Sequence, residues 1–325
     1  NENEKYLFEI NSDCNLLCFS NSTKDYLIKC SGYQIRNAKS FRLGVIDSIK
    51  FNENYCKDFN KNIKIISQEN KGLGISRNVG INHSNGKYLW FVDGDDYIDS
   101  SKVLKMLEYS ISNDLDVLWF DHELVNENYN LIEKPKEDLK DTLSTNIYVG
   151  SIFLKEVFKK SCMVCMFLFK KQHLLDNNLT FEHGVYFEDI LFTPICIDKA
   201  ERVSLYNEVC YYYLIREDSI MRSRDKAVKR INDGIYASYV LKKYVNVARE
   251  KKYFVSFSNQ LLIYNLRRAA KINKIEFTNL YLKAVKYKLI PVSCVSDIVD
   301  VKLKLSSLLI NLLGLRFYIV ARLLK

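Results

Sequence analysis

Short apolar runs alternate with helix-forming segments over the first two thirds of this 325-residue chain. The runs typical of strands are residues 15–19, 41–46, 63–67, 87–92, 117–120, 163–169 and 203–215. Helical patterns lie between them, at residues 24–36, 75–84, 102–113 and 151–160. Because strands that alternate with helices build a sheet covered by helices, this pattern predicts an α/β domain with a mostly parallel sheet.

The charge of the chain is unevenly distributed. Residues Arg222 to Lys325 hold 22 Lys and Arg against 6 Asp and Glu, a balance of +16, whereas residues 1–221 have a balance of −7. From about residue 226 the pattern is helical. We therefore expect two regions, an α/β domain at 1–225 and a basic helical region at 226–325. The basic region contains no DNA- or RNA-reading motif, so we expect an anionic membrane surface and no nucleic acid as its partner.

The last 25 residues predict a terminal amphipathic helix. The longest uncharged run, Leu305 to Leu315, is too short to span a bilayer. On a helix, one stripe is polar or basic, and comprises Lys304, Ser307, Asn311, Tyr318, Arg322 and Lys325. Leucines and other apolar residues cover most of the remaining surface. This pattern favours a helix that lies in a membrane interface. A terminal helix docked on its own domain is the alternative.

The cysteines and the first residues indicate where the chain works. Nine cysteines at scattered spacings suit a reducing cytosol better than a disulfide framework. Cys162 and Cys165 lie in an apolar stretch and are expected to be buried strand residues. Residues 1–13 contain no apolar signal core, so export is not expected. Together with the basic tail, this predicts a cytoplasmic protein that is peripheral on the inner face of the plasma membrane.

Three carboxylates follow the apolar strand at residues 87–92. Asp93, Asp95 and Asp96 fall within four residues, at a point where open α/β sheets bind ligands. Clustered carboxylates repel one another unless a cation compensates them, and Mg²⁺ or Mn²⁺ bridging to a diphosphate would do so. The alternative is an acidic turn before the next helix, for which Asp99 is a suitable N-cap.

A glycine-containing turn precedes this cluster. Gly72 and Gly74 follow a strand and open a helix, so their backbone N–H groups suit a phosphate. Arg77, one turn into the helix, adds a planar guanidinium. Two glycines alone are a weak signal for a dinucleotide-binding oxidoreductase, which we rank last among the possible functions.

Three segments and their spacing resemble the family 2 glycosyltransferases of the GT-A fold. They are Asn70-Lys-Gly-x-Gly-x-x-Arg-Asn-x-Gly80, Gly86-Lys-Tyr-x-x-Phe-Val-Asp-Gly-Asp-Asp96 and Gly184-Val-Tyr-Phe-Glu-Asp-Ile-Leu-Phe192. The resemblance covers about residues 15–225 and is typical of bacterial surface-polysaccharide enzymes. It implies a Rossmann-like GT-A domain, a nucleotide-sugar donor (a UDP-sugar is favoured), a divalent metal and inverting transfer to a glycan or lipid-linked acceptor.

The resemblance also assigns roles to individual residues. It implies that Asp189 is the general base for the acceptor hydroxyl, with Glu188 beside it. Asp95 and Asp96 would hold the metal. The residues that would contact the donor are Asp47, Arg77, Asp93, Asp95 and Arg216.

One loop departs from the family pattern. Where the family has Asp-Asp-Gly-Ser, this chain has Asp47-Ser-Ile-Lys50, which keeps the first carboxylate and loses the glycine. This difference leaves open a second hypothesis, in which the chain is a catalytically weak or inactive relative that binds a partner or a glycan.

Overall fold

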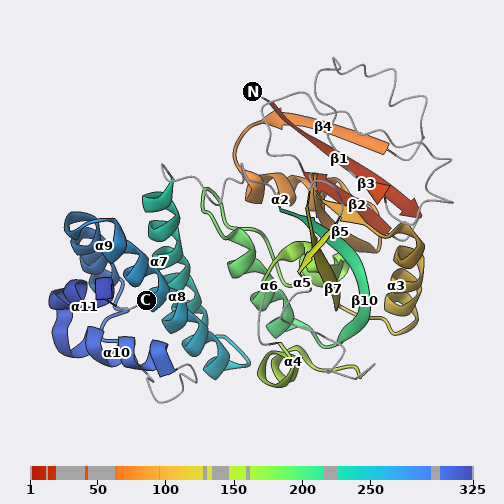
Figure 1. Cartoon of the computed structure of the whole chain (residues 1–325). Helices are drawn as coiled ribbons and strands as arrows, with labels where there is room; N and C mark the ends of the chain where they lie inside the picture. Colours follow the sequence, from red (N-terminus) through yellow and green to blue (C-terminus); the bar gives the residue numbers. More distant parts are fainter. Residues whose placement is uncertain are drawn as a thin grey trace.

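The computed structural model describes residues 2–11, 14–19, 41–42, 63–94, 96–126, 130–133, 146–158, 162–215, 226–293 and 301–323. A ten-stranded sheet lies at the centre of the first part of the chain (Figure 1). Its strands are β1 (Glu2–Asn11), β2 (Cys14–Phe19), β3 (Phe41–Arg42), β4 (Ile63–Glu69), β5 (Tyr88–Asp93), β6 (Tyr97–Ile98), β7 (Val117–Val125), β8 (Leu131–Glu133), β9 (Phe167–Lys170) and β10 (Val203–Leu214). Their order is β3-β6-β10-β7-β9-β5-β2-β1-β4, and β8 pairs with β7.

The central strands share one direction. β2 is parallel to β5, and β7 is parallel to β10. β9 lies between β5 and β7 and is antiparallel to both, so β2, β5, β7 and β10 point the same way. The α/β class is thus confirmed, although the sheet is more mixed than the mostly parallel one expected. The carboxyl ends of these four strands therefore lie on the same side of the sheet, and ligands bind just beyond such strand ends in sheets of this kind.

The helices of the first part are α2 (Leu73–His83), α3 (Ser100–Ser112), α4 (Gly150–Glu156), α5 (Lys171–Asp176) and α6 (Glu188–Lys199). β5 lies between β9 and β2 in the sheet, and its apolar residues are fully buried. Trp90 contacts Phe120 edge-on, and its indole N–H donates to the carbonyl of Cys165 at 2.8 Å. Cys162 and Cys165 are buried, as predicted, but residues 164–166 form a 3₁₀ turn before β9.

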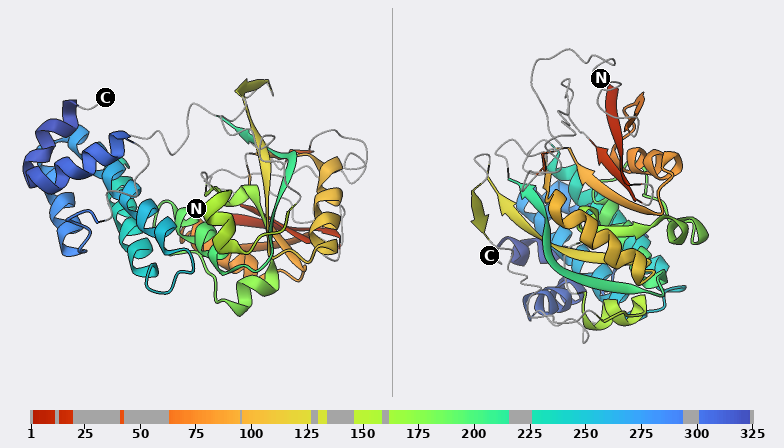
Figure 2. Two further views of the ribbon diagram at one scale, coloured as in Figure 1. Left: turned by 90° about the horizontal axis from the view of Figure 1, so that it is seen from below. Right: turned by 90° about the vertical axis from the view of Figure 1, so that its right-hand side faces the viewer.

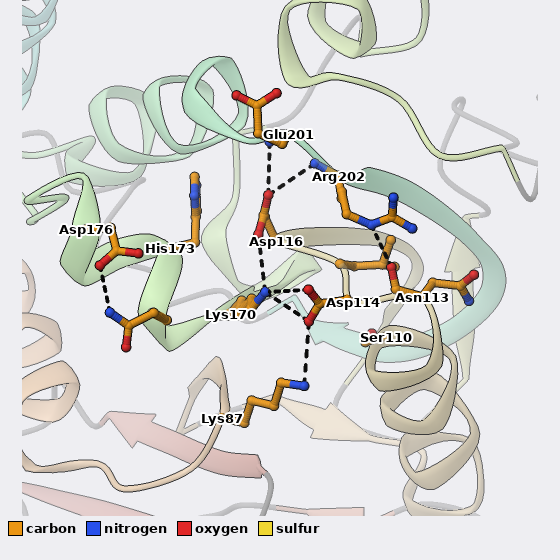
Figure 3. A network of polar contacts seen from close by, with 12 residues as sticks. Lys87, Ser110, Asn113, Asp114, Asp116, Lys170, His173, Asp176, Glu201 and Arg202 are labelled. Carbon is orange, nitrogen blue, oxygen red and sulfur yellow. Dashed lines mark hydrogen bonds and ion pairs between the residues drawn. The ribbon is translucent and has the colours of Figure 1, made fainter.

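A network of ion pairs and hydrogen bonds lies at the opposite side of the sheet, beside the amino ends of β7 and β10 (Figure 3). Lys170 Nζ lies 2.9 Å from Asp114 Oδ1 and 3.8 Å from Asp116 Oδ1. Asp116 Oδ2 also accepts the backbone N–H groups of Glu201 and Arg202, at 2.9 and 3.1 Å. These contacts join the starts of β7 and β10 to the end of β9. The charged residues at this edge are therefore paired with one another, far from the edge where Asp93 lies.

The last hundred residues are helical, as predicted, in the ranges that the structure describes. The helices are α7 (Ala227–Tyr244), α8 (Lys251–Ile272), α9 (Lys274–Lys286), α10 (Val301–Leu313) and α11 (Phe317–Leu323), with the 3₁₀ turn η5 (Gly314–Arg316) between the last two. α9, α10 and α11 lie beyond α7 and α8 as seen from the sheet (Figures 1 and 2).

α7 and α8 join two hydrophobic cores. Leu241 and Phe254 belong to the core of the sheet, whereas Ile235 and Leu262, on the same two helices, belong to a second core with α9 to α11. Asp198 of α6 strengthens the junction, because its carboxylate accepts the backbone N–H of Arg249 at 2.9 Å and the Tyr244 hydroxyl at 2.9 Å. The expected boundary at residue 225/226 coincides with the start of α7 but not with a break in the packing.

Candidate active site

Arg77 brings together carboxylates from two distant parts of the chain. Its Nη1 lies 2.6 Å from Glu188 Oε1, and its Nη2 lies 3.1 Å from Asp93 Oδ1. Asp93 is the last residue of β5, and Glu188 is the first residue of α6. The side chain of Arg77 is only 4% exposed. The burial of Arg77 would lower its pKa, but Asp93, Glu188 and Asp189 outweigh this effect and raise the pKa above its ordinary value.

The close approach of α2 to the segment before α6 explains this contact. A Cβ on Gly74 would lie 2.5 Å from the carbonyl oxygen of Glu182, so only glycine fits there. One turn later, the Asn78 side chain accepts the N–H of Phe181 at 2.8 Å and donates to its carbonyl at 2.9 Å. The guanidinium of Arg77 also lies 5.4 Å from the centre of the Phe181 ring. The glycine–arginine motif thus attaches α2 to residues 181–188.

Asp189 occupies the first turn of α6 beside Glu188. Phe187, just before this helix, has a left-handed backbone with φ of 68°. A non-glycine residue in this conformation is strained, and such strain is common at functional sites. Burial, followed by the charge of Glu188, raises the pKa of Asp189 to about 7, while Arg77 acts in the opposite direction. A carboxylate with a pKa near neutral pH is well suited to take up a proton.

Asp96 is an anchor inside the protein. It is 1% exposed, and its Oδ2 accepts the hydroxyl of Tyr211 at 2.6 Å. Its Oδ1 accepts the backbone N–H of Leu214 at 2.8 Å. The same Tyr211 hydroxyl accepts the N–H of Asp93 at 3.2 Å. β10 thereby fixes the turn that follows β5, and these contacts give Asp96 a structural role in this turn.

α7 supports the segment that leads to Asp189. The carboxylate of Asp233 accepts the backbone N–H of Tyr186 at 3.0 Å, and Lys229 Nζ donates to the carbonyl of Gly184 at 2.9 Å. Lys229 also pairs with Asp233 and lies 4.7 Å from the centre of the Tyr186 ring. The basic helical region therefore contacts the site directly, two to five residues before Glu188 and Asp189.

The sequence did not indicate these supporting residues clearly. Asp233 lies in a region where acidic residues are scarce, and this scarcity is the one signal that distinguishes it. Tyr211 lies among three consecutive tyrosines, and the sequence does not distinguish the one whose hydroxyl reaches Asp96. Both residues act on backbone segments that are distant in the sequence, which composition and spacing do not indicate.

Three of the expected donor- or metal-binding residues, Asp47, Asp95 and Arg216, lie outside the described residues. Arg77 and Asp93 are close together, and the ion pairs of Arg77 given above are with Asp93 and Glu188. Within the described ranges, no group of three or more His, Cys, Asp or Glu side chains is arranged to hold a metal ion. The expected metal roles of Asp95 and Asp96 stay predictions.

Comparison with known proteins identifies a segment that includes Arg77 and Asp93. Residues 47–177 match the sequence model "Glycosyl transferase family 2". The chain is 25% identical over 194 residues to the uncharacterized glycosyltransferase YibD of Escherichia coli, covering 57% of this chain and 54% of YibD. It is 32% identical over 168 residues to the poly(ribitol-phosphate) beta-glucosyltransferase of Bacillus spizizenii, covering 51% of this chain and 25% of that enzyme. The chain thus spans about half of the length of YibD and a smaller share of the second relative.

A solved structure has a similar fold. The crystal structure of Staphylococcus aureus TarS 1–349 in complex with UDP-GlcNAc superposes with a TM-score of 0.53 at 18% identity, covering 77% of this chain and 71% of that one. The sequence match and the structural similarity both point to the glycosyltransferases that the motifs at residues 70–96 and 184–192 resemble. The segment of residues 47–177 thus matches glycosyltransferase family 2, and the fold of the described residues is similar to that of TarS.

Proposed function

We propose that this chain transfers a sugar from a nucleoside-diphosphate sugar to a hydroxyl group of a cell-surface glycan, with inversion at the anomeric carbon. The observation that carries the proposal is the Arg77 cluster. It holds the carboxylate at the end of β5 and the carboxylates at the start of α6 in one site. Transfer needs both: a donor-binding edge, and a base on the acceptor side.

In this proposal, Asp189 removes the proton of the acceptor hydroxyl. The acceptor oxygen bonds to the anomeric carbon while the bond to the diphosphate breaks, and the proton moves to Asp189. Its carboxylate is oriented because Oδ1 accepts the N–H of Ile190 at 2.8 Å. A pKa of about 7 leaves a useful fraction ionised at neutral pH and still gives affinity for the proton.

A UDP-sugar is the donor we favour. TarS, the structural relative, was crystallised with UDP-GlcNAc and with UDP, which supports a nucleotide-sugar donor for this fold. Poly(ribitol-phosphate) glycosyltransferases among the relatives support a cell-surface polymer as the acceptor. A lipid-linked form of that acceptor agrees with the basic C-terminal region, which suits an anionic membrane.

A divalent ion, Mn²⁺ or Mg²⁺, fits the carboxylates after β5. Such an ion binds through one or two carboxylates and the oxygens of the substrate phosphates, so it needs no group of three protein ligands. Asp93 lies at this edge, and Asp95 follows two residues later; we propose Asp95 as the main ligand. When bound, the ion would neutralise negative charge on the departing diphosphate.

The proposal is tested by measuring transfer and donor hydrolysis with a panel of UDP-, GDP- and CDP-sugars, with Mn²⁺ and with EDTA. We expect one class of donor to be consumed, Asp189→Asn to lower the rate about 100-fold or more, and Asp95→Asn to weaken Mn²⁺-dependent nucleotide binding. An equal rate for Asp189→Asn would contradict the assignment of the base. If no nucleotide binds in calorimetry, the chain is instead a non-catalytic binding subunit.

A further inference from the structure

Some polar residues of the final helices face the protein and not the water. Ser306 and Ser307 of α10 are fully buried, and their hydroxyls donate to carbonyls one turn earlier in the helix, at 2.8 Å. Asn311 bonds to the backbone N–H and carbonyl of Val292, at 2.7 and 3.0 Å. Tyr318 packs against Phe277 of α9. Part of the expected polar stripe, Ser307 and Tyr318, is thus turned inward, whereas Lys304, Asn311 and Arg322 are exposed.

The outward side is correspondingly apolar. Six exposed residues follow one another at steps of three and four: Val301, Leu305, Leu308, Leu312, Leu315 and Ile319. Leu312 is 79% exposed and Ile319 is 65% exposed. We call these six residues the outer apolar face. Four of them lie on α10, Leu315 lies in η5 and Ile319 on α11. So many exposed aliphatic side chains within 19 residues are unusual in a protein surrounded only by water, and they mark a surface that contacts something apolar.

Basic residues flank this face. Lys302, Lys304, Arg316 and Arg322 are exposed, and residues 301–323 contain no Asp or Glu. The surrounding region, from Arg222 to Lys325, has a balance of +16. A partner that suits both features is apolar inside and negatively charged at its surface, which describes an anionic bilayer.

The geometry indicates a segment that lies along a membrane. By length and composition, Val301–Arg322 would be apolar enough to cross one. However, α10 has 13 residues and so extends about 20 Å, whereas the hydrocarbon core is about 30 Å thick. Gly314 then interrupts the helix with a φ of 55°, and α11 follows after a 3₁₀ turn. Ile310, Phe317 and Ala321 are buried in the second core, and α10 and α11 both contact α8, so one side of the segment is held within the protein.

We propose that α10, η5 and α11 dock this protein on an anionic lipid surface, with the outer apolar face in the acyl-chain boundary and the flanking lysines and arginines at the headgroups. A second copy of the chain is a poorer occupant, because each copy would bring the same basic charge to the contact. The proposal does not depend on the proposed reaction. The location at the inner face of the plasma membrane stays a prediction.

Flotation of the full chain with vesicles tests this surface. One set of vesicles is pure phosphatidylcholine, and the other contains equal parts of phosphatidylcholine and phosphatidylglycerol. We expect binding to the anionic vesicles and much weaker binding to the neutral ones. Leu312→Glu together with Ile319→Glu should lower the partition coefficient about tenfold or more, because two anionic side chains replace aliphatic ones in the acyl boundary. Both positions are exposed, so we expect the variant to fold, which circular dichroism checks.

The matched control is Val247→Glu, since Val247 is 73% exposed but lies between α7 and α8, outside the outer apolar face. It should float like the wild type. Equal flotation of the wild type and the double variant on anionic vesicles would overturn the proposal. So would absent flotation of the wild type together with a dimer, seen by light scattering, that the double variant loses; the face would then join two copies.

Discussion

Arg77 of α2 and Glu188 of α6 are separated by 111 residues in sequence, and their side chains meet at 2.6 Å beside Asp189. The other Arg77 nitrogen holds Asp93 at the end of β5. One buried guanidinium thus connects the edge that is expected to bind the donor with the helix that carries the expected base. Its charge also opposes the rise in the pKa of Asp189.

Arg77→Ala should destabilise the protein by about 3–5 kcal/mol, because it leaves the buried carboxylate of Glu188 without its partner. It should also move the acidic limb of the activity profile to higher pH, since Arg77 lowers the pKa of Asp189. Urea unfolding and a pH series of transfer rates measure the two effects. Arg77→Lys keeps the charge and should show smaller changes. An unfolding free energy equal to that of the wild type would contradict the account.

Asp233→Ala should reduce kcat and leave the donor KM nearly unchanged. The substitution removes the acceptor for the Tyr186 N–H, so the segment before Asp189 loses its support from α7, while the donor edge at β5 is untouched. Steady-state kinetics at saturating acceptor separate the two constants. Val228→Ala, on the preceding turn of α7, is the control and should behave like the wild type. A change confined to the donor KM would assign Asp233 a different role.

Tyr211→Phe should destabilise the protein by about 1.5–3 kcal/mol, because Asp96 loses a hydrogen bond to its buried carboxylate. The turn after β5 should loosen too, since the same hydroxyl accepts the N–H of Asp93. We therefore expect the nucleotide Kd, measured by calorimetry, to rise. Tyr213→Phe, two residues along β10, is the comparison. Unchanged stability and nucleotide binding would show that this hydroxyl does not hold the turn.

Asp189→Asn should stabilise the protein at pH 8 and have less effect at pH 5. The pKa of Asp189 is raised to about 7 in the folded state, above its unfolded value, so the folded state disfavours the ionised form. This cost is absent below the unfolded pKa, grows as pH rises toward 7 and is fully present above 7. Asn remains neutral, so we expect a gain of up to about 4 kcal/mol at pH 8, since one pKa unit corresponds to about 1.4 kcal/mol. Unfolding curves at both pH values decide, and a larger gain at pH 5 would contradict the raised pKa.

The sequence predicted most of the central strands and helices because their apolar runs are short, clear and bounded by turn residues. It missed β1, because the apolar run Tyr6-Leu7-Phe8 is short and flanked by charged residues, and this segment was considered only as an export signal. Its antiparallel pairing with β2 and β4, and the insertion of β9, make the sheet mixed. Strand direction depends on contacts between distant segments, which local patterns do not contain.

The motifs predicted which residues belong to the site, but not which side chains and carbonyl groups those residues contact. The sequence did not predict that Gly74 permits contact with the carbonyl of Glu182, or that Arg77 pairs with two carboxylates. The terminal helix was predicted as amphipathic, but Ser307 of its polar stripe is buried, with its hydroxyl bonded to the carbonyl of Leu303 in the same helix, and Asn311 bonds to Val292. Which side of a helix turns inward is decided by the surface on which it docks.

The most direct test of the central claim is the pH dependence of kcat/KM for wild type and Glu188→Gln. If Asp189 is the base, the wild-type rate rises with pH through an apparent pKa near 7. Glu188→Gln removes the neighbouring charge that raises this pKa, while its side-chain oxygen still accepts from Arg77, so the rising limb should move to lower pH. A limb that is absent, or that stays in place in Glu188→Gln, would contradict Asp189 as the base of this site.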